Sequence, residues 1–306
     1  MTPLRLGYLY GFAAYLMWGF FPLYFKLLRP AGPLEILAHR VIWSVAFVAL
    51  LLGAMRNIGF LRTLLRRPRA LAGIAAAAVL IGLNWFTYIY GVNSDRVVET
   101  ALGYFINPLV VVLLGVAVLR ERLRPAQWCA LGIGGLAVAV LTVDYGQLPY
   151  IALILALTFG GYSLVKKQLG LPAAEGLFVE SAVLALPALG YLGWLAATGE
   201  IAFGQVSTGH TLLLVIAGAL TAIPLLLFAG AANRLPLSSL GMLQYVAPIL
   251  QLGCGVLIFH EPMPPARLAG FALVWLALIV FTADGLRQAR RTRRQPPVTV
   301  SPAAVS

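Results

Sequence analysis

Ten apolar runs, each about as long as a membrane-crossing helix, follow one another along most of the chain. A helix needs about 20 residues to cross the hydrocarbon core of a bilayer. The runs cover residues 7–28, 34–54, 70–90, 97–119, 125–143, 148–165, 175–197, 211–231, 236–259 and 266–283. None alternates like a strand and the connections are short, so we predict an all-α membrane protein without an inserted soluble domain.

The composition leads to the same class. Of the 306 residues, 61% are hydrophobic and only 10% are charged, whereas a soluble domain carries about 25% charged residues. The net charge of +12 comes from basic residues at the ends of the runs. In those places they meet anionic lipid head groups, so we expect a lipid bilayer as partner and no nucleic acid.

The distribution of Lys and Arg also predicts an orientation. With the amino terminus in the cytoplasm, most of the 22 basic residues fall in cytoplasmic loops, as the positive-inside rule requires. Both termini are then cytoplasmic. The segment 287–306 is basic and then rich in Pro, Ser and Val, and we predict a disordered tail outside the fold.

A repeat divides the chain into two halves. Three residues of the fourth run and the turn after it recur 140 positions later: Pro108, Glu121 and Pro125 match Pro248, Glu261 and Pro265. Five runs per half is an odd number, so the second half enters the membrane upside down. We therefore predict two inverted units, 1–146 and 147–286, with a binding site near mid-membrane between them.

Four stretches, 11–28, 35–44, 83–109 and 220–251, carry a resemblance to a known family. The chain resembles the EamA-domain permeases of the RarD type, in the drug/metabolite transporter superfamily. The resemblance implies ten transmembrane helices as two inverted five-helix EamA repeats. It also implies passage of small metabolites or drugs across a bacterial inner membrane, usually outward. Proteins of this type are often labelled chloramphenicol-sensitivity proteins.

Polar and small residues of the fourth run recur at three- and four-residue spacing, which places them on one stripe of a helix. The stripe consists of Thr100, Gly103, Tyr104 and Asn107 and ends at Pro108. The ninth run carries Gln244 and Pro248 in matching positions. Pro108 frees the carbonyl of Tyr104 from its helical partner and tends to kink the helix. Two polar helices broken by proline at matching positions point to a transporter binding site. The alternative is ordinary contact between helices through Gly103.

Other runs supply further candidates for the wall of a substrate cavity. Asn84 and Tyr88 share one face of the third run, Trp18 and Pro22 lie on the first, and Tyr162 lies on the sixth. Each has a structural alternative. Asn84 could form a hydrogen bond between helices, and an aromatic residue at helical spacing is more often part of the core than a ligand contact.

Charged residues at the edges of the runs are the candidates for ion coupling or for an external vestibule. Lys26 ends the first run, Glu35, His39 and Arg40 open the second, and Glu99 opens the fourth. A charge inside a membrane costs about 2.5–3.5 kcal/mol on insertion scales, so each needs a reason. The alternatives are snorkelling for Lys26, a structural Glu–Arg pair, and a helix N-terminal charge for Glu99.

The function that we predict is a secondary permease for a small organic substrate. The sequence has no His-Glu-x-x-His helix, no Gly-x-Ser-x-Gly and no nucleotide-binding loop, so we expect no enzyme, no ATP, no cofactor and no metal. A ten-span inverted repeat argues against a channel built from symmetric subunits. We predict alternating access around a central cavity, and a flippase for an amphipathic lipid-like substrate is the alternative. A homodimer is left open as an alternative to a single chain.

Overall fold

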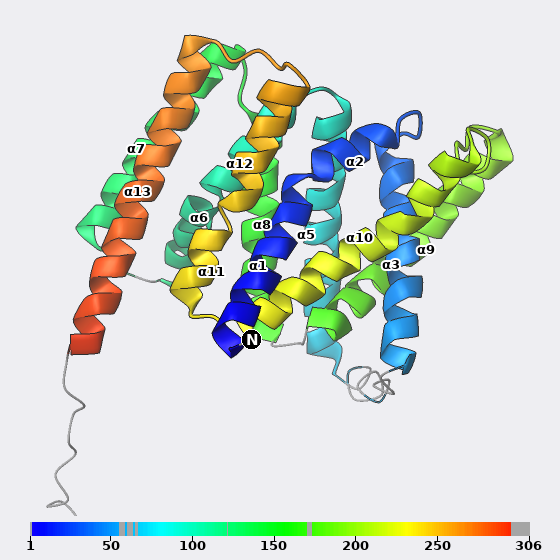
Figure 1. Ribbon diagram of the computed structural model, residues 1–306, viewed down its shortest axis with the longest axis horizontal. Coiled ribbons are helices and arrows are strands. Elements are labelled where there is room, and N and C mark those ends of the chain that lie inside the picture. The colour runs from blue at the N-terminus through cyan, green and yellow to red at the C-terminus, as the bar shows by residue number, and fades with distance from the viewer. Residues whose placement is uncertain are drawn as a thin grey trace, which may run out of the picture.

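The computed structural model describes residues 2–54, 59, 64, 67–120, 122–169 and 173–294, and every regular element in them is a helix (Figure 1). The predicted all-α class is therefore confirmed for this part of the chain. The elements are α1 (Pro3–Gly19), α2 (Phe21–Leu27), α3 (Pro33–Ala54), α5 (Pro68–Asn93), α6 (Val97–Leu119), α7 (Pro125–Tyr145), α8 (Tyr150–Leu169), α9 (Ala173–Thr198), α10 (Thr208–Ala232), α11 (Leu237–Leu243), α12 (Val246–Gly253), the π-helical turn η1 (Cys254–Ile258) and α13 (Pro265–Arg294).

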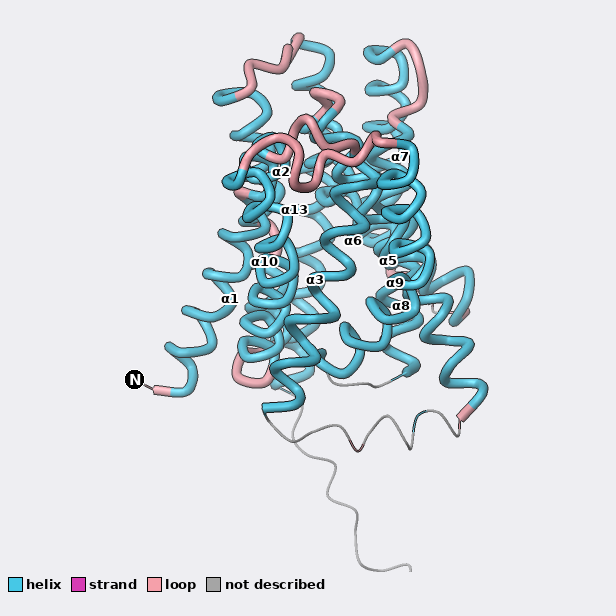
Figure 2. The backbone as a smooth tube through the Cα atoms, turned by 90° about the vertical axis from the view of Figure 1, so that its right-hand side faces the viewer, coloured by secondary structure: helices cyan, strands magenta, loops and turns pink. Residues whose placement is uncertain are grey.

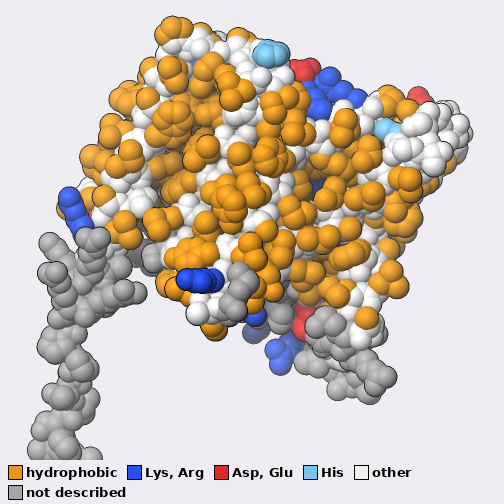
Figure 3. Space-filling view, viewed as in Figure 1, with side chains coloured by type: hydrophobic (Ala, Val, Ile, Leu, Met, Phe, Trp, Pro, Cys, Tyr) orange, Lys and Arg blue, Asp and Glu red, His pale blue; other side chains and the backbone are white. Residues whose placement is uncertain are grey.

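Seven of the described helices are long and apolar enough to cross a membrane: α3, α5, α6, α7, α9, α10 and α13. Two shorter apolar helices accompany them, Tyr150–Lys166 and Val246–Ile258. The outer surface agrees with this assignment, because hydrophobic side chains cover the face shown in Figure 3 and several charged ones lie near its ends. Val143 and Leu186, for example, are 83% and 77% exposed. Such side chains are suited to contact with lipid tails.

Two of the predicted runs are interrupted. Run 7–28 is divided into α1 and α2 at Phe20, and run 236–259 is divided into α11 and α12 at Gln244 and Tyr245. A proline follows each break within a few residues, and proline cannot donate the hydrogen bond that would continue the helix. By contrast, α6 runs through Pro108 without interruption, so the predicted disturbance of the fourth run does not break it.

The helices form a bundle in which neighbours in space are often distant in sequence (Figures 1 and 2). The helix α3 packs against α9 and α10, α8 packs against α5 and α6, and α1 packs against α10 and α12. The pair α7 and α13 lies at one side of the bundle (Figure 1). Asp144 of α7 pairs with Arg267 of α13 at 2.9 Å, and Arg124 pairs with Asp284 at 2.7 Å. These ion pairs close both ends of the antiparallel pair.

The last helix is longer than the sequence predicts. Run 266–283 becomes α13, which continues to Arg294, so residues 287–294 of the predicted tail are helical. Arg and Gln favour the helix, and positive charge near its C-terminus complements the helix dipole. Residues 295–306 lie outside the described residues. The amino terminus and the end of α13 lie at the same end of the bundle (Figure 1).

One glycine sets the distance between α3 and α10. A Cβ atom at Gly218 would lie 2.2 Å from the backbone carbon of Trp43 and 2.6 Å from the backbone nitrogen of Ser44. No flexible side chain can yield there, because the obstacle is backbone. The close approach holds the next turn of α10, which carries Thr221, against the middle of α3.

We predict that Gly218→Ala separates α3 from α10 and destabilises the protein by about 1–3 kcal/mol, the usual cost of overpacking. Thermal unfolding of the detergent-solubilised protein measures the effect. Gly190→Ala on α9 is the matched control, since a Cβ there meets nothing within 4 Å. Equal or greater stability is expected for that control. A Gly218→Ala protein as stable as the wild type would contradict the role of this contact.

Candidate functional site

The break between α1 and α2 is joined to the break region of the second half. Pro22 cannot donate to the carbonyl of Trp18, and the side chain of Gln251 on α12 donates to that oxygen instead, at 3.0 Å. An irregular backbone at membrane depth is tolerated only where such partners exist. The predicted cavity residues Trp18 and Pro22 therefore lie where the two interrupted helices meet.

Arg40 occupies the middle of the helix group formed by α2, α3, α5 and α10. It is 5% exposed, and its Nε donates to Thr221 Oγ1 at 2.7 Å. Its guanidinium carbon lies 4.2 Å from the ring centre of Trp85, 5.6 Å from that of Phe25 and 5.7 Å from that of Phe21. Three aromatic faces thus surround one cation, which cation–π attraction stabilises.

Tyrosines extend this aromatic group toward α6. Tyr88 packs between Phe25 and Tyr104, with ring centres 5.9 and 5.7 Å apart. Its hydroxyl is buried and has no hydrogen-bond partner among the described residues. Asn84, predicted to line the cavity, donates to the Leu155 carbonyl at 2.9 Å and so joins α5 to α8. That contact is the hydrogen bond between helices that the sequence left open.

The stripe on α6 divides between two environments. A Cβ atom at Gly103 would lie 2.9 Å from the carbonyl oxygen of Ala152, so Gly103 belongs to the close contact between α6 and α8. Thr100 donates to the carbonyl of Val97 within the first turn of α6. Asn107 is 9% exposed, and its Oδ1 has no partner within the described part of the chain. Five predicted cavity residues are half-buried: Trp18, Tyr104, Pro108, Tyr162 and Gln244. Pro248 is buried.

Glu180 on α9 is a buried charge that the sequence analysis missed. It is 1% exposed, and it accepts hydrogen bonds from Lys166 at 2.7 Å and from Tyr162 at 3.0 Å. Glu180 lies 140 positions after Arg40, which is the offset of the repeat. A search of the sequence for charged residues that lie 140 positions apart within the runs would therefore have identified Glu180.

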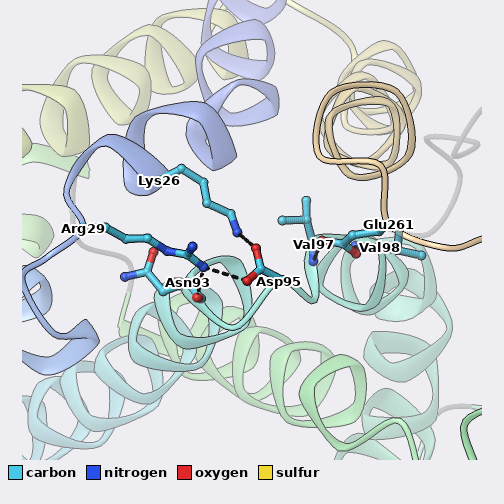
Figure 4. A network of polar contacts seen from close by, with 7 residues as sticks. All are labelled: Lys26, Arg29, Asn93, Asp95, Val97, Val98 and Glu261. Atoms are coloured by element: carbon cyan, nitrogen blue, oxygen red, sulfur yellow. Dashed lines mark hydrogen bonds and ion pairs between the residues drawn. The ribbon is translucent and has the colours of Figure 1, made fainter.

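Ionic contacts join the end of α2 to the connection between α5 and α6 (Figure 4). Lys26 donates to Asp95, and Arg29 donates to Asp95 at 3.0 Å and to the carbonyl of Asn93. The hydrogen bond from Lys26 is the main cause that lowers the pKa of Asp95 below its ordinary value, and Arg29 adds to the effect. We call Lys26, Arg29, Asn93 and Asp95 the ionic latch.

Carboxylates at the same end cap the first turns of neighbouring helices. Glu261 accepts from the backbone nitrogens of Val97 and Val98 at 2.6 and 2.8 Å (Figure 4). Glu99 accepts from the backbone nitrogen of Ile151 at 3.0 Å. The first N–H groups of a helix lack partners within it and attract negative charge. Burial raises the pKa of Glu261, and the two backbone N–H groups oppose that shift.

Arg40 does not join Glu35 and His39 in one charged group, whereas Glu35 Oε1 and His39 Nε2 lie 3.9 Å apart. Glu35 accepts from the backbone nitrogens of Ala202 and Phe203 at 2.9 and 3.0 Å, so it fixes the connection between α9 and α10. The ring of His39 stacks on that of Phe203, with centres 4.5 Å apart. Arg40 instead contacts Thr221 and the aromatic rings. Among the described residues no three His, Cys, Asp or Glu side chains come together to hold a metal.

Comparison with known proteins agrees with this architecture. The sequence pattern of the EamA-like transporter family matches residues 5–143. "Protein RarD" of Streptomyces exfoliatus is 54% identical over 98% of this chain and 96% of its own length. The chain belongs to the EamA-like transporter family. An "Uncharacterized transporter" of Bacillus subtilis is 42% identical, covering 94% of this chain and 97% of its own.

A more distant sequence relative and a solved structure also resemble this EamA-like transporter. The "Chloramphenicol-sensitive protein RarD" of Pseudomonas aeruginosa is 32% identical over 94% of this chain and 97% of its own. A solved structure described as "Crystal structure of protein" matches 92% of this chain and 98% of its own, with a TM-score of 0.59 and 23% identity. The latter likeness concerns the fold alone. The resemblance to RarD-type EamA permeases is confirmed.

We predict that Asp95→Asn opens the latch of this EamA-like transporter and exposes the residues beneath it. The reporter is Val92→Cys, in a variant whose Cys129 and Cys254 are replaced, because Val92 is 0% exposed below Asn93. Two surface ion pairs are worth about 1 kcal/mol together, so labelling by a membrane-impermeant thiol reagent should become about fivefold faster. Glu200→Gln, which removes an exposed carboxylate from the same end, is the control.

The same reporter tests the pH dependence of the latch. A carboxyl group with a lowered pKa stabilises the folded contact above its ordinary pKa, here 3.8, and loses the effect only as pH falls through the lowered value. Asp95 therefore stays ionised from about pH 8 to about pH 5. Only the thiolate reacts, so the labelling rate of Val92→Cys is divided at each pH by that of a fully exposed cysteine. With Asp95 in place, we expect this relative rate to be the same over the interval. A relative rate that rises toward pH 5 would refute the latch as the determinant of access.

Proposed function

We propose that this chain is a secondary, ATP-independent permease that moves a small organic substrate by alternating access between its two halves. The observation that carries the proposal is the meeting of the two interrupted helices, α1–α2 and α11–α12, through Gln251 and the Trp18 carbonyl. The two interruptions come from different halves, and backbone left without its helical partner at membrane depth is tolerated where it is bonded to protein or lines a cavity, as in transporter binding sites. We propose the half-buried Trp18, Tyr104, Tyr162 and Gln244 as the cavity wall.

The contacts between helices support two inverted repeats and ten spans. We match α1–α2 to α8, α3 to α9, α5 to α10, α6 to α11–α12, and α7 to α13. Under this match α6–α8 corresponds to α12–α1, α5–α8 to α10–α1, and α3–α10 to α9–α5, and all of these pairs are in contact. The spans are then the seven long helices, α8 and the two interrupted ones. The family pattern ends at residue 143, next to the proposed boundary at 146.

The ionic latch gives the proposed cycle a closed side. Phe25, Val92 and Val97, which lie beneath it, are at most 1% exposed, whereas the cavity residues further along the helices are half-buried. We propose that the latch faces the exterior of a bacterial inner membrane and that both termini are cytoplasmic, as the positive-inside rule indicates. The conformation is then closed to the outside, and export of the substrate begins from the opposite side.

We predict that Asn107→Ala lowers transport about tenfold without lowering stability. The Oδ1 of Asn107 has no partner among the described residues, so its removal leaves no new unsatisfied group in the protein. The test uses purified protein in liposomes and follows labelled chloramphenicol and a panel of amino acids, with and without a pH gradient. Asn233→Ala, at the end of α10, is the control for loss of an amide.

Four outcomes of this experiment decide the proposal. Flux that needs the protein, no ATP and Asn107 supports a permease with the proposed cavity. Flux that is unchanged in Asn107→Ala places the substrate elsewhere. A response to the pH gradient would add proton coupling and direct attention to buried Glu180. Scrambling of a fluorescent lipid in the same vesicles, without flux of any solute, would refute the permease and support the alternative function, a lipid flippase.

A further inference from the structure

Arg40 differs from the other charged side chains that the described part of the chain buries. Glu35 accepts two backbone hydrogen bonds. Glu99 accepts one and lies 2.5 Å from Arg96, and Glu180 is bonded to Lys166. Arg40, in contrast, has one hydrogen bond, to Thr221, and no carboxylate of the described residues lies within ion-pair distance of it. It is a cation without a counterion at membrane depth, which is costly.

The guanidinium has donors to spare. It carries five N–H groups in a planar fork, and within the described part of the chain only the Nε–H has a hydrogen-bond partner, Thr221. The guanidinium carbon lies 4.2 Å from the ring centre of Trp85 and 5.6 Å from that of Phe25. No polar partner of the two Nη groups is found among the described residues. The rings supply apolar surface around the cation but no negative charge.

A second polar group beside Arg40 also lacks a partner. The hydroxyl of Tyr88 is buried and unsatisfied within the described residues, and Tyr88 is close enough to Arg40 to interact with it electrostatically. Phe25 contacts both residues, with its ring 5.6 Å from the Arg40 carbon and 5.9 Å from the Tyr88 ring. Buried hydroxyls nearly always have partners. Two unsatisfied donors near the same ring point to a ligand that accepts hydrogen bonds.

We propose that Arg40 binds the carboxylate of the transported substrate, which is an organic monoanion with an aromatic or apolar body. This assignment rests on the proposed permease and names its substrate class. A carboxylate matches the guanidinium fork with two parallel hydrogen bonds. One guanidinium neutralises one negative charge, so a monoanion fits better than a phosphate dianion. Trp85, Phe21 and Phe25 then contact the body of the substrate.

The equivalent position in the other half of the chain supports the assignment of Arg40 to the substrate. Glu180 occupies the position of Arg40 in the other half, but Lys166 and Tyr162 neutralise and bond it. One of the two equivalent buried charges is thus satisfied by the protein, and the other is left for the ligand. A zwitterion would need a second, anionic contact for its ammonium group, and Glu180 is already occupied by Lys166.

The test measures binding to the purified full chain with three probes of the same shape: phenylpropionate, phenylpropionamide and phenylpropylamine. Ligand-induced thermal stabilisation and quenching of tryptophan fluorescence give the affinities. We expect phenylpropionate to bind at least about tenfold more tightly than the amide, because hydrogen bonds to a charged group are worth about 1.5–3 kcal/mol. In Arg40→Gln this preference should disappear, while binding of the amide changes less than about twofold.

Two further variants separate binding from folding. Arg69→Gln removes an exposed arginine and should keep the full preference for the carboxylate. If Arg40→Gln does not fold, Thr221→Val serves in its place, because it removes the one hydrogen bond that orients Arg40. It should weaken binding of phenylpropionate a few-fold and leave the amide unchanged.

The outcomes that overturn the proposal are distinct from those that overturn the permease. Tighter binding of the amide or the amine, no binding of any probe, or an equal loss of acid and amide in Arg40→Gln would each refute the anion site. If flux of neutral solutes persists in those cases, the permease stands alone. Tight, Arg40-dependent binding of phenylpropionate without its movement in liposomes would instead refute the permease and keep the site.

Discussion

The structure depends on one constraint: a polar backbone group inside a membrane must have a partner, because no water is available to it. Prolines remove such partners at Pro22 and Pro248, and both helices break there. The Trp18 carbonyl that Pro22 frees is satisfied by Gln251 from the other half of the chain. At the helix starts, Glu99 and Glu261 do the same for orphaned N–H groups of α8 and α6. The partner that the α1–α2 break requires therefore joins this break to α12.

This constraint also separates structural charges from the proposed functional one. Most of the charged residues at the edges of the runs prove to be bonded to backbone or to an opposite charge, and so contribute to stability. Removing the partner of a buried charge destabilises the protein strongly. A charge bonded in this way is therefore poorly suited to exchange partners in a transport cycle. Arg40 has the opposite character, with one bond, three aromatic neighbours and free donors. The site is recognised by what the protein leaves unsatisfied.

The sequence predicted the helices better than their partners. Run 97–119 coincides with α6, because a long apolar run between charged turns has only one way to lie in a bilayer. The break at Phe20 was not predicted, since a proline within a helix is tolerated or not according to a partner such as Gln251, 233 positions away. Asn84 and Arg40 show the same limit. Spacing placed Asn84 on one face with Tyr88, and sequence proximity grouped Arg40 with Glu35. Tertiary contacts decide that Asn84 bonds to α8 and that Arg40 lies among aromatic rings.

The contacts that a transport cycle must exchange can be separated from those that it can keep. The pair α7–α13 is closed by an Arg–Asp ion pair at each end, and its inner face belongs to a continuous apolar core with α6. Moving these helices apart would break both pairs at once. The latch is different, because the side chain of Asp95 is 66% exposed and its two ion pairs, to Lys26 and Arg29, are worth about 1 kcal/mol together. Under the proposed cycle, substrate bound at Arg40 shifts these outer contacts when it binds the open form more tightly than the closed form by more than about 1 kcal/mol, because a ligand moves a conformational equilibrium only by its difference in affinity for the two states.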